Sequence, residues 1–247
     1  MSNDKRFLEV QNIHKEFGNV LALNNVSISA SKGEVLAIVG DNGAGKSTLV
    51  KILSGALTPD KGKIVVGNKK FSSLTPKTAL KAGISTVYQD LALANSRDVA
   101  ANIFLGRELT KRGFLDNKKM HIEAEKLIDG LEIDIPDVRV PVAVLSGGQR
   151  QGVAVARSVY QKGSFFIFDE PTAAMGLVET NAVLKLIKKL ANQGYGIIII
   201  SHNMAQVFEI SNRICVMRHG KIAGLKKTKD TTTEEIVSMI TGAGEIL

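Results

Sequence analysis

The sequence predicts an α/β fold built on a mainly parallel sheet, with an antiparallel β portion near the N-terminus and a helical insert. Three observations lead to it. Val35–Val39 is a continuous apolar run, as in strands buried on both faces, and a glycine-rich loop and a helix-like segment follow it. Strand-like and helix-like segments alternate again from Phe165 to Ser201, which is typical of parallel strands joined by helices. Between Leu8 and Ile28, short alternating runs separated by polar turns indicate antiparallel strands instead.

The remaining elements are justified by caps, breakers and periodicity. The N-terminal third is completed by a strand at Lys63–Val66, a helix at Ser47–Leu53 stopped by Gly55, a helix begun by Thr75 and Pro76 and ended by Gly83, and a strand at Ile84–Tyr88. The C-terminal third is expected to hold a strand at Phe165–Phe168, a helix at Val178–Asn192 ended by Gly194, a strand at Ile197–Ser201, and a last helix with Thr231 and Glu234 as a capping box.

Helical patterns dominate the middle of the chain. Helices are expected at Asp98–Phe104, Lys118–Leu131 and Gly147–Tyr160, with Pro136 and Pro141 breaking the chain between the last two. We therefore interpret the 247 residues as one domain. Residues 1–91 and 162–247 form its catalytic core with the β subdomain, and residues 92–161 form an inserted helical subdomain.

A phosphate-binding loop lies between the strand at 35–39 and the helix that follows it. Gly40–Ser47 fits the pattern G-x-x-x-x-G-K-[ST], whose glycines let backbone N–H groups turn toward phosphates. Lys46 is expected to reach the β- and γ-phosphates, and the Ser47 hydroxyl to ligate Mg²⁺. The sequence thus predicts a P-loop NTPase fold. The residues expected to contact the nucleotide here are Gly40, Asp41, Asn42, Gly43, Ala44, Gly45, Lys46, Ser47 and Thr48.

Polar side chains also follow other predicted strands, where α/β folds place their ligand crevice. Asp169 suits a Mg²⁺ ligand, and Glu170 suits the residue that orients and deprotonates the attacking water. His202 can donate a hydrogen bond to the γ-phosphate, and the Gln89 amide can contact Mg²⁺ or the water. Taken singly, each also fits a structural role, such as acidic residues that cap the helix beginning at Pro171.

A second anion site is predicted at Ser146-Gly147-Gly148, just before the helix that continues through Gln149. A hydroxyl, exposed N–H groups and a helix N-terminus together attract negative charge. If this site lies on the helical insert, it is too distant to serve the nucleotide of its own chain. A head-to-tail pair of chains would solve this by burying each ATP between them.

Composition limits the remaining possibilities. The longest apolar runs are strand-sized, so the chain is not expected to cross a membrane by itself, and its polar start does not resemble a secretory signal. The net charge of +8 suggests nucleic acid or an anionic membrane surface as partners. Because no aromatic residues interleave with the lysines, a platform for single strands is unsupported. The single cysteine, Cys215, excludes an internal disulfide and is interpreted as a core residue.

The motifs together make the chain, from about Phe7 to Ile240, resemble the ATP-binding subunit of an ABC (ATP-binding cassette) transporter. The resemblance equates Gly40–Ser47 with Walker A, Gln89 with the Q-loop, Leu145–Gln149 with the signature motif, Phe165–Asp169 with Walker B, Glu170 with the catalytic glutamate and His202 with the switch histidine. It implies that Ser146, Gly147, Gly148 and Gln149 complete the ATP site, that Lys46, Gln89, Glu170 and His202 are catalytic, and that Ser47, Gln89 and Asp169 bind Mg²⁺.

Two positions depart from the family pattern. The aromatic residue that stacks on adenine is usually tyrosine, and the matching residue here is Phe17, which keeps the stacking face but lacks the hydroxyl. The segment after Pro171 usually ends in an aspartate that links the two sites of a dimer. Gly176 takes that place here, so communication between the sites is put in question.

More narrowly, four segments resemble cassettes of bacterial ribose, xylose and fructose importers, namely Gly40–Gly45, Thr86–Leu93, Asn102–Glu108 and Ser201–Asn203. This resemblance implies ATP and Mg²⁺ as cofactors and a homodimer, because the chain has a single cassette. It also implies a separate membrane permease, an extracellular or periplasmic sugar-binding protein reached through it, no nucleic acid, and a peripheral position on the cytoplasmic face of the membrane. The identity of the sugar is not written in the sequence.

Two other functions fit part of the sequence. A soluble ABC-type ATPase acting on DNA or ribosomes would suit the basic charge. However, DNA-repair members carry a very long coiled coil for which Lys46 and Ser146 are too close, and ribosome-acting members usually hold two cassettes. A nucleotide-binding regulatory subunit with little turnover is disfavoured by the intact Lys46, Asp169, Glu170 and His202.

Overall fold

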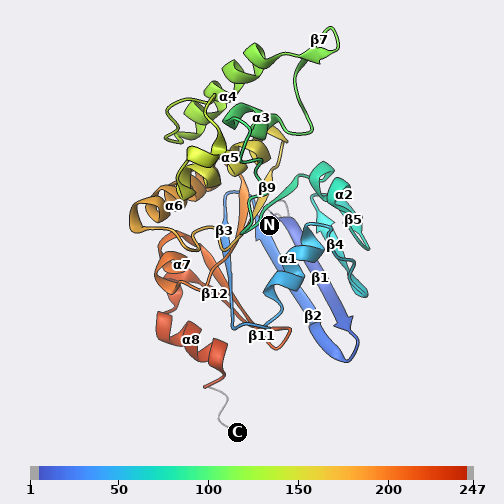
Figure 1. Cartoon of the computed structure of the whole chain (residues 1–247). Helices are drawn as coiled ribbons and strands as arrows, with labels where there is room; N and C mark the ends of the chain where they lie inside the picture. Colours follow the sequence, from blue (N-terminus) through green and yellow to red (C-terminus); the bar gives the residue numbers. More distant parts are fainter. Residues whose placement is uncertain (1–5, 244–247) are drawn as a thin grey trace.

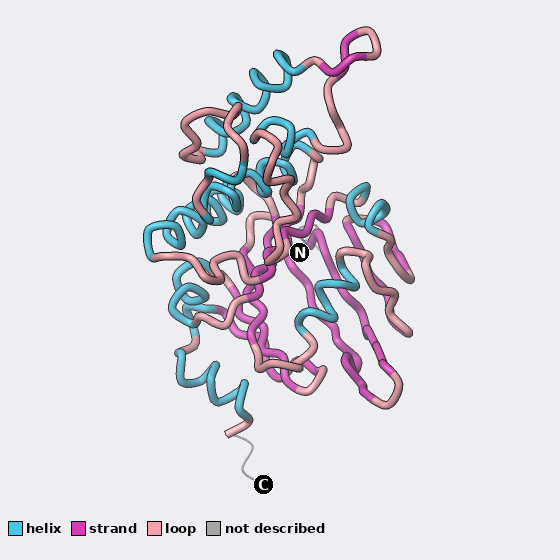
Figure 2. Tube along the Cα trace, viewed as in Figure 1, coloured by secondary structure: helices cyan, strands magenta, loops and turns pink. Residues whose placement is uncertain are grey.

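Two main sheets organise the chain in the computed structural model, which describes residues 6–243 (Figures 1 and 2). A six-stranded sheet has the order β12-β11-β3-β10-β9-β6, and all its pairs are parallel except β11 with β12. A four-stranded antiparallel sheet has the order β2-β1-β4-β5. This confirms the predicted mainly parallel sheet with an antiparallel N-terminal portion.

The strands of the six-stranded sheet are β3 (Val35–Val39), β6 (Ile84–Val87), β9 (Phe165–Asp169), β10 (Gly196–Ile200), β11 (Arg213–Arg218) and β12 (Lys221–Lys227). Those of the antiparallel sheet are β1 (Arg6–Phe17), β2 (Val20–Ser31), β4 (Lys61–Val66) and β5 (Lys69–Phe71), and a separate hairpin pairs β7 (Thr110–Lys111) with β8 (Phe114–Leu115).

Both faces of the six-stranded sheet are buried, and neighbouring side chains of its central strands enter opposite hydrophobic clusters. In β10, Ile197 and Ile199 belong to the cluster on the helical side, whereas Ile198 and Ile200 belong to the cluster shared with the antiparallel sheet. Strands β3, β9 and β11 alternate in the same way. Two-sided burial explains why these strands read as continuous apolar runs. Cys215 of β11 is one of these core residues, as predicted, and burial raises the pKa of its thiol to about 12.

Helices cover the two faces unequally. The first cluster takes side chains from α3 (Val99–Phe104), α4 (Asn117–Leu131), α5 (Gly147–Tyr160), α6 (Leu177–Asn192), α7 (Met204–Ile210) and α8 (Thr233–Thr241), and the second from α1 (Lys46–Leu53) and α2 (Pro76–Lys81). Figure 1 shows α3, α4 and α5 gathered at the end of the molecule away from the β1–β2 hairpin. No helix within residues 6–243 is both long and apolar enough to span a bilayer.

The helical insert is continuous with the core. Met120 and Ala124 of α4 lie in the same hydrophobic cluster as Val35 and Ala37 of β3. Short 3₁₀ turns at Val142–Val144 and after β12 (Thr228–Asp230) complete the chain. The subdomain boundaries at residues 92 and 161 therefore stay a prediction, because no separate core marks them.

One predicted cap was wrong by one residue. In place of the expected capping box of Thr231 and Glu234, the N-cap is Thr232, whose hydroxyl accepts a hydrogen bond from the Glu235 N–H at 3.3 Å, and α8 begins at Thr233. Ile236 of this helix is fully buried, and its burial fixes which face of α8 meets the core. With two adjacent threonines available, this packing decides which one caps the helix.

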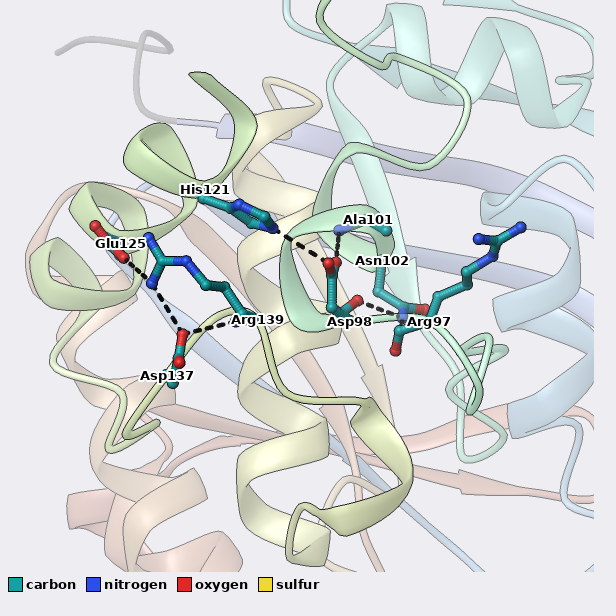
Figure 3. Close-up of polar contacts among 8 residues, drawn as sticks. All are labelled: Arg97, Asp98, Ala101, Asn102, His121, Glu125, Asp137 and Arg139. Carbon is teal, nitrogen blue, oxygen red and sulfur yellow. Dashed lines mark hydrogen bonds and ion pairs between the residues drawn. The ribbon is translucent and has the colours of Figure 1, made fainter. Parts of the chain in front are cut away.

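Polar contacts join the elements of the helical insert (Figure 3). Asp98 caps the N-terminus of α3 through its side chain and also lies 3.2 Å from His121 Nε2 of α4. Arg139 bridges Glu125 of α4 at 2.9 Å and Asp137 at 3.1 Å. These contacts orient α3 and the loop after α4 against the same helix.

Asn102 of α3 fastens the loop that precedes its own helix. The side chain is fully buried, and its Oδ1 accepts a hydrogen bond from the Ala94 N–H at 2.8 Å. Its Nδ2 donates to the carbonyls of Asp98 (2.9 Å), Ala94 (3.1 Å) and Arg97 (3.3 Å). A buried amide satisfied in this way specifies one loop conformation.

We expect Asn102→Ala to lower the free energy of unfolding by about 2–3 kcal/mol, because it leaves buried backbone groups without partners. Urea denaturation followed by circular dichroism measures this loss. Asn181→Ala, on an exposed position of α6, is the matched control and should change stability by no more than about 0.5 kcal/mol. Equal midpoints for the two variants would contradict the role of the Asn102 amide.

Candidate nucleotide-binding and hydrolysis site

Four adjacent parallel strands deliver the predicted site residues to one edge of the sheet. In the order β3, β10, β9 and β6, their carboxyl ends lead into Gly40, His202, Glu170 and Gln89. The register is shared, since Ile200 of β10 lies opposite both Ile38 of β3 and Asp169 of β9. The topology thus brings together groups that are far apart in the sequence.

The phosphate loop closes onto the start of α1. Gly45 occupies the left-handed N-cap position with φ of 101°, and α1 begins at Lys46. The Lys46 ammonium donates to the carbonyls of Gly40 at 2.6 Å and Asp41 at 2.9 Å, so its side chain folds back over the loop. Of the predicted contact residues, Ala44 is buried, Gly40, Gly45, Lys46 and Thr48 are half-buried, and Asp41, Asn42, Gly43 and Ser47 are exposed.

Two glycines of this loop are required by close backbone approaches. A Cβ on Gly40 would lie 2.2 Å from the Met217 carbonyl of β11, and one on Gly45 would lie 2.6 Å from the Ala22 carbonyl of β2. Gly43 also has a positive φ of 81°, but a Cβ there would meet nothing within 4 Å. The loop is therefore wedged at its two ends, with a β11 carbonyl against Gly40 and a β2 carbonyl against Gly45, whereas its middle is open.

Opposite charges converge beneath the loop. Burial lowers the pKa of Lys46, an effect that the nearby Glu170, Asp41 and Asp169 carboxylates partly offset. Burial and the neighbouring Glu170 charge raise the pKa of Asp169, and Lys46 opposes that shift. Lys46, Asp169 and Glu170 thus form one electrostatic cluster, although Lys46 begins α1 and the two carboxylates lie at the end of β9.

Glu170 and His202 form a pair at the same edge. Glu170 Oε2 lies 2.9 Å from His202 Nδ1, and the Glu170 N–H donates to the Ile200 carbonyl at 3.0 Å. The Glu170 backbone is left-handed, with φ of 50°. Its side chain is 21% exposed whereas that of His202 is 77% exposed. The glutamate is therefore enclosed, and the histidine is accessible to a group approaching from solvent.

A pocket of about 280 Å³ lies between this pair and the start of α5, with Gln89, Glu170 and Gly147 in its wall. Gln151 also lines it, although the residue is only 2% exposed. Its Nε2 has no hydrogen-bond partner within residues 6–243. We identified this buried amide only from the structure, since a glutamine inside an amphipathic helix gives no sequence signal of burial.

The second predicted anion site is built as a helix cap. The Gln149 N–H donates to Ser146 Oγ at 3.3 Å, and the Ser146 N–H donates to Gln149 Oε1 at 3.0 Å. Ser146, Gly148 and Gln149 line a groove of about 540 Å³ between α5 and α6, separate from the pocket at Glu170. Among the described residues, no hydrogen bond or ion pair joins them to the phosphate loop.

Phe17 ends β1 at the hairpin to β2, and its side chain is about half exposed at 49%. Lys15 Nζ lies 5.4 Å from the centre of its ring. The following strand contributes Ala22, the residue that approaches Gly45 most closely. The hairpin that carries Phe17 is thus packed on the phosphate loop, while the adenine-stacking role stays a prediction.

Two arginines missed by the sequence interpretation connect α5 to the segment after Gln89. Arg157 donates to the carbonyls of Leu91 at 2.7 Å and Ala92 at 3.1 Å, and Arg150 donates to Asn95 Oδ1 at 3.0 Å. Burial lowers the pKa of Arg157. Their spacing of seven residues, which places both on one helix face, was the available signal.

Comparison with known protein families identifies the family of this chain. The ABC transporter family matches residues 23–173, a span that holds the phosphate loop, Gln89, the Ser146 cap and the Asp169–Glu170 pair. The chain belongs to this family. It is therefore an ABC-type ATPase that uses ATP.

Relatives of this cassette carry import names. It is 50% identical to the xylose/arabinose import ATP-binding protein XylG of Sulfolobus acidocaldarius over 95% of this chain and 93% of that protein. It is 42% identical to the fructose import ATP-binding protein FrcA of Rhizobium meliloti, covering 96% and 95% of the two chains. It is 41% identical to the ribose import ATP-binding protein RbsA 2 of Escherichia coli O157:H7, but 97% of this chain spans only 47% of that protein.

Solved cassettes share the fold. A nucleotide-free ATP-binding cassette from an ABC transporter superposes with a TM-score of 0.82 at 26% identity, covering 96% of this chain and 95% of that one. The ADP conformation of MJ1267, an ATP-binding cassette of an ABC transporter, gives 0.82 at 27% identity with the same coverage. The predicted P-loop NTPase fold is thereby confirmed as that of an ABC cassette.

The donor set of the cassette fits Mg²⁺. The predicted ligands Ser47, Gln89 and Asp169 all offer oxygen atoms, which Mg²⁺ prefers. Within the part of the chain that the structure describes, no three His, Cys, Asp or Glu side chains cluster as a metal cage.

The phosphate loop predicts a contrast between two glycine substitutions. Gly45→Ala combines a left-handed backbone with a clash against the Ala22 carbonyl, so we expect a loss of about 2–4 kcal/mol in stability and of ATP binding. Gly43→Ala has the backbone strain alone and should cost about 1 kcal/mol. Thermal unfolding and titration with a fluorescent nucleotide measure both, and equal effects would contradict the wedged loop.

The raised pKa of Asp169 predicts a pH-dependent gain from neutralising it. Because the pKa is higher in the folded state than in the unfolded chain, the ionised carboxylate destabilises the fold at neutral pH. Asp169→Asn should raise the free energy of unfolding near pH 7, and the gain should vanish below about pH 3.9. The same variant should lose at least about tenfold in MgATP turnover. A stability difference that grows on acidification would contradict the assigned pKa direction.

Proposed function

We propose that this cassette hydrolyses MgATP to power the import of a sugar through a separate membrane permease. The observation that carries the hydrolytic part is the 2.9 Å Glu170–His202 pair beside Asp169 and Lys46 at one sheet edge. The transport part is supported by the import names of relatives that are 41–50% identical over nearly the whole chain.

In this proposal each residue at the edge has one task. Lys46 and the N–H groups of residues 40–47 bind the β- and γ-phosphates, and Phe17 stacks on the base. Glu170 orients the attacking water and takes its proton. His202 contacts Glu170 and donates a hydrogen bond to the γ-phosphate, which fixes their relative position. Ser47, Asp169 and Gln89 would hold Mg²⁺, which would supply neutralisation of the phosphate charge.

We propose that two copies of the chain act as a homodimer. Ser146 and Gly148 line the groove between α5 and α6, and within residues 6–243 neither makes a hydrogen bond to the phosphate loop of its own chain. In this proposal a second chain therefore brings its cap to the nucleotide. Leu177 and Val178, two adjacent apolar residues at the start of α6 near this cap, are 78% and 82% exposed, so a second chain could bury them. Each ATP would then be held by the loop of one copy and the Ser146–Gly148 cap of the other.

We propose that the permease contacts the segment after Gln89. Tyr88 and Leu105 are partly exposed and line a pocket of about 350 Å³ together with Arg157. Because Arg157 binds the Leu91 and Ala92 carbonyls, pressure on this segment would reach the helix that begins at Gly147. The cassette would then sit on the cytoplasmic face of the membrane, and the sugar-binding protein would act through the permease.

The choice of sugar is proposed to lie outside the cassette. Relatives named for xylose and arabinose, fructose, and ribose are similar to this chain over nearly its entire length. Specificity in such importers is expected in the binding protein and the permease.

We expect Glu170→Gln to abolish ATP turnover and to accumulate an ATP-bound dimer, because the amide cannot accept the proton but keeps the shape of the side chain. Light scattering with ATP measures the dimer, and phosphate release measures turnover. Glu209→Gln, an exposed residue that pairs with Lys188, serves as the control and should behave as the wild type. ATP hydrolysis at the wild-type rate by the Glu170 variant would contradict the assignment of Glu170 as the catalytic base.

A further inference from the structure

The segment that follows Glu170 reaches α6 through a series of tight turns. The Ala173 N–H donates to the Glu170 carbonyl at 3.1 Å, and the Met175 N–H donates to the Thr172 carbonyl at 3.3 Å. The segment ends at Gly176, the N-cap of α6, which has no side chain with which to contact anything beyond its own helix. Any connection from this segment to α5 must therefore come from another residue.

Glu179, in the first turn of α6, makes that connection with both of its carboxylate oxygens. Oε2 accepts a hydrogen bond from the Gly176 N–H at 3.3 Å, and Oε1 accepts one from the Gly147 N–H of α5 at 3.1 Å. The side chain thus joins the N-termini of two helices, although Gly147 precedes Glu179 by 32 residues in the sequence. Both helix ends carry partial positive charge, which favours a carboxylate between them.

The packing around this bridge is close. A Cβ on Gly148 would lie 3.3 Å from Glu179 Cβ and 3.4 Å from its Cα, tighter than ordinary contact. A Cβ on Gly147 would lie 3.6 Å from Met175 Cγ. The two glycines of the Ser146 cap are therefore seated directly against Met175 and the start of α6, so a displacement of either side at this contact presses on the other.

We propose that Glu179 is a positioning residue that couples the Glu170 segment of one site to the Ser146–Gly148 cap of the other. This inference rests on the proposed homodimer, in which the cap of one chain completes the nucleotide site of its partner. A shift of residues 170–176 at one site would move the Glu179 carboxylate and, with it, Gly147 and Ser146. Glu179 of α6 thus provides the side-chain contact that Gly176, which has no side chain, cannot make in this chain.

A purely local role for Glu179 makes different predictions. Glu179 occupies the third position of α6, where a carboxylate commonly caps its own helix. A cap alone would affect the stability of α6 and leave turnover per folded molecule unchanged. A coupling role would lower turnover and cooperativity in folded protein, without affecting nucleotide binding to the separate phosphate loop.

The test compares Glu179→Ala and Glu179→Gln with Glu123→Ala, which removes a solvent-facing carboxylate of α4 that pairs with Lys126. In the alanine variant we expect kcat to fall roughly tenfold or more, because both hydrogen bonds to a charged group are lost. We expect the Hill coefficient for ATP to approach 1, and fluorescent ADP affinity to stay within about twofold of wild type. The kcat of the glutamine variant, whose amide oxygen can still accept one hydrogen bond, should lie between those of the alanine variant and the wild type. The control should match the wild type.

A second measurement tests the hydrogen bond from the Gly147 N–H to Glu179 directly. Amide hydrogen exchange of the peptide over residues 145–150 should be faster in Glu179→Ala than in wild type and unchanged in Glu123→Ala. If kcat and the Hill coefficient of both Glu179 variants stay within twofold of wild type, the coupling is overturned. It is also overturned if activity falls only in proportion to the folded fraction, and the glutamine variant decides this point should the alanine variant fail to fold.

Failure of the proposed function has a different signature. A wild-type protein that neither hydrolyses ATP nor dimerises would overturn the homodimeric ATPase. The bridge itself is then judged by exchange alone, and unchanged protection of the Gly147 amide in Glu179→Ala would overturn the link as well.

Discussion

The register of four parallel strands, fixed by burial on both faces, is the constraint on which the rest of this structure depends. Each central strand sends alternate side chains into two different hydrophobic clusters. A slip of one residue in β9 would exchange Phe165 with Phe166 between the clusters and carry Asp169 away from Ile200. The chemistry at the sheet edge is thus set by apolar packing several residues away from it.

This arrangement brings together partly buried charges of opposite sign, each of which is less unfavourable beside the other than it would be alone. Asp169 has a raised pKa because it is partly buried beside Glu170, and Lys46 has a lowered pKa because it too is shielded from water. Each group limits the shift of the other. Local strain accompanies the charge, since Glu170 adopts a left-handed backbone. Such features are typical of a site selected for its chemistry, with stability supplied by the surrounding core.

Much of this could be predicted from the sequence because the signals were local. The bounds of α5 and the caps at Thr75 and Ser146 follow from residues within four positions of one another. Elements decided by tertiary packing were missed: α7, β12 and the two-residue strands of the hairpin carry weak periodic patterns. Of the site, the strand-end residues were predicted, whereas the Arg157 and Glu179 contacts were not. These contacts join helices whose relative placement no short motif encodes.

Cys215 has a practical consequence. The thiol is enclosed between two sheets and titrates only near pH 12, so at neutral pH it is neither accessible nor ionised for alkylation. A cysteine introduced anywhere on the surface would then be the single reactive thiol of the molecule. Spectroscopic labels or cross-linkers can therefore be attached at one chosen point without first removing a native group from the core.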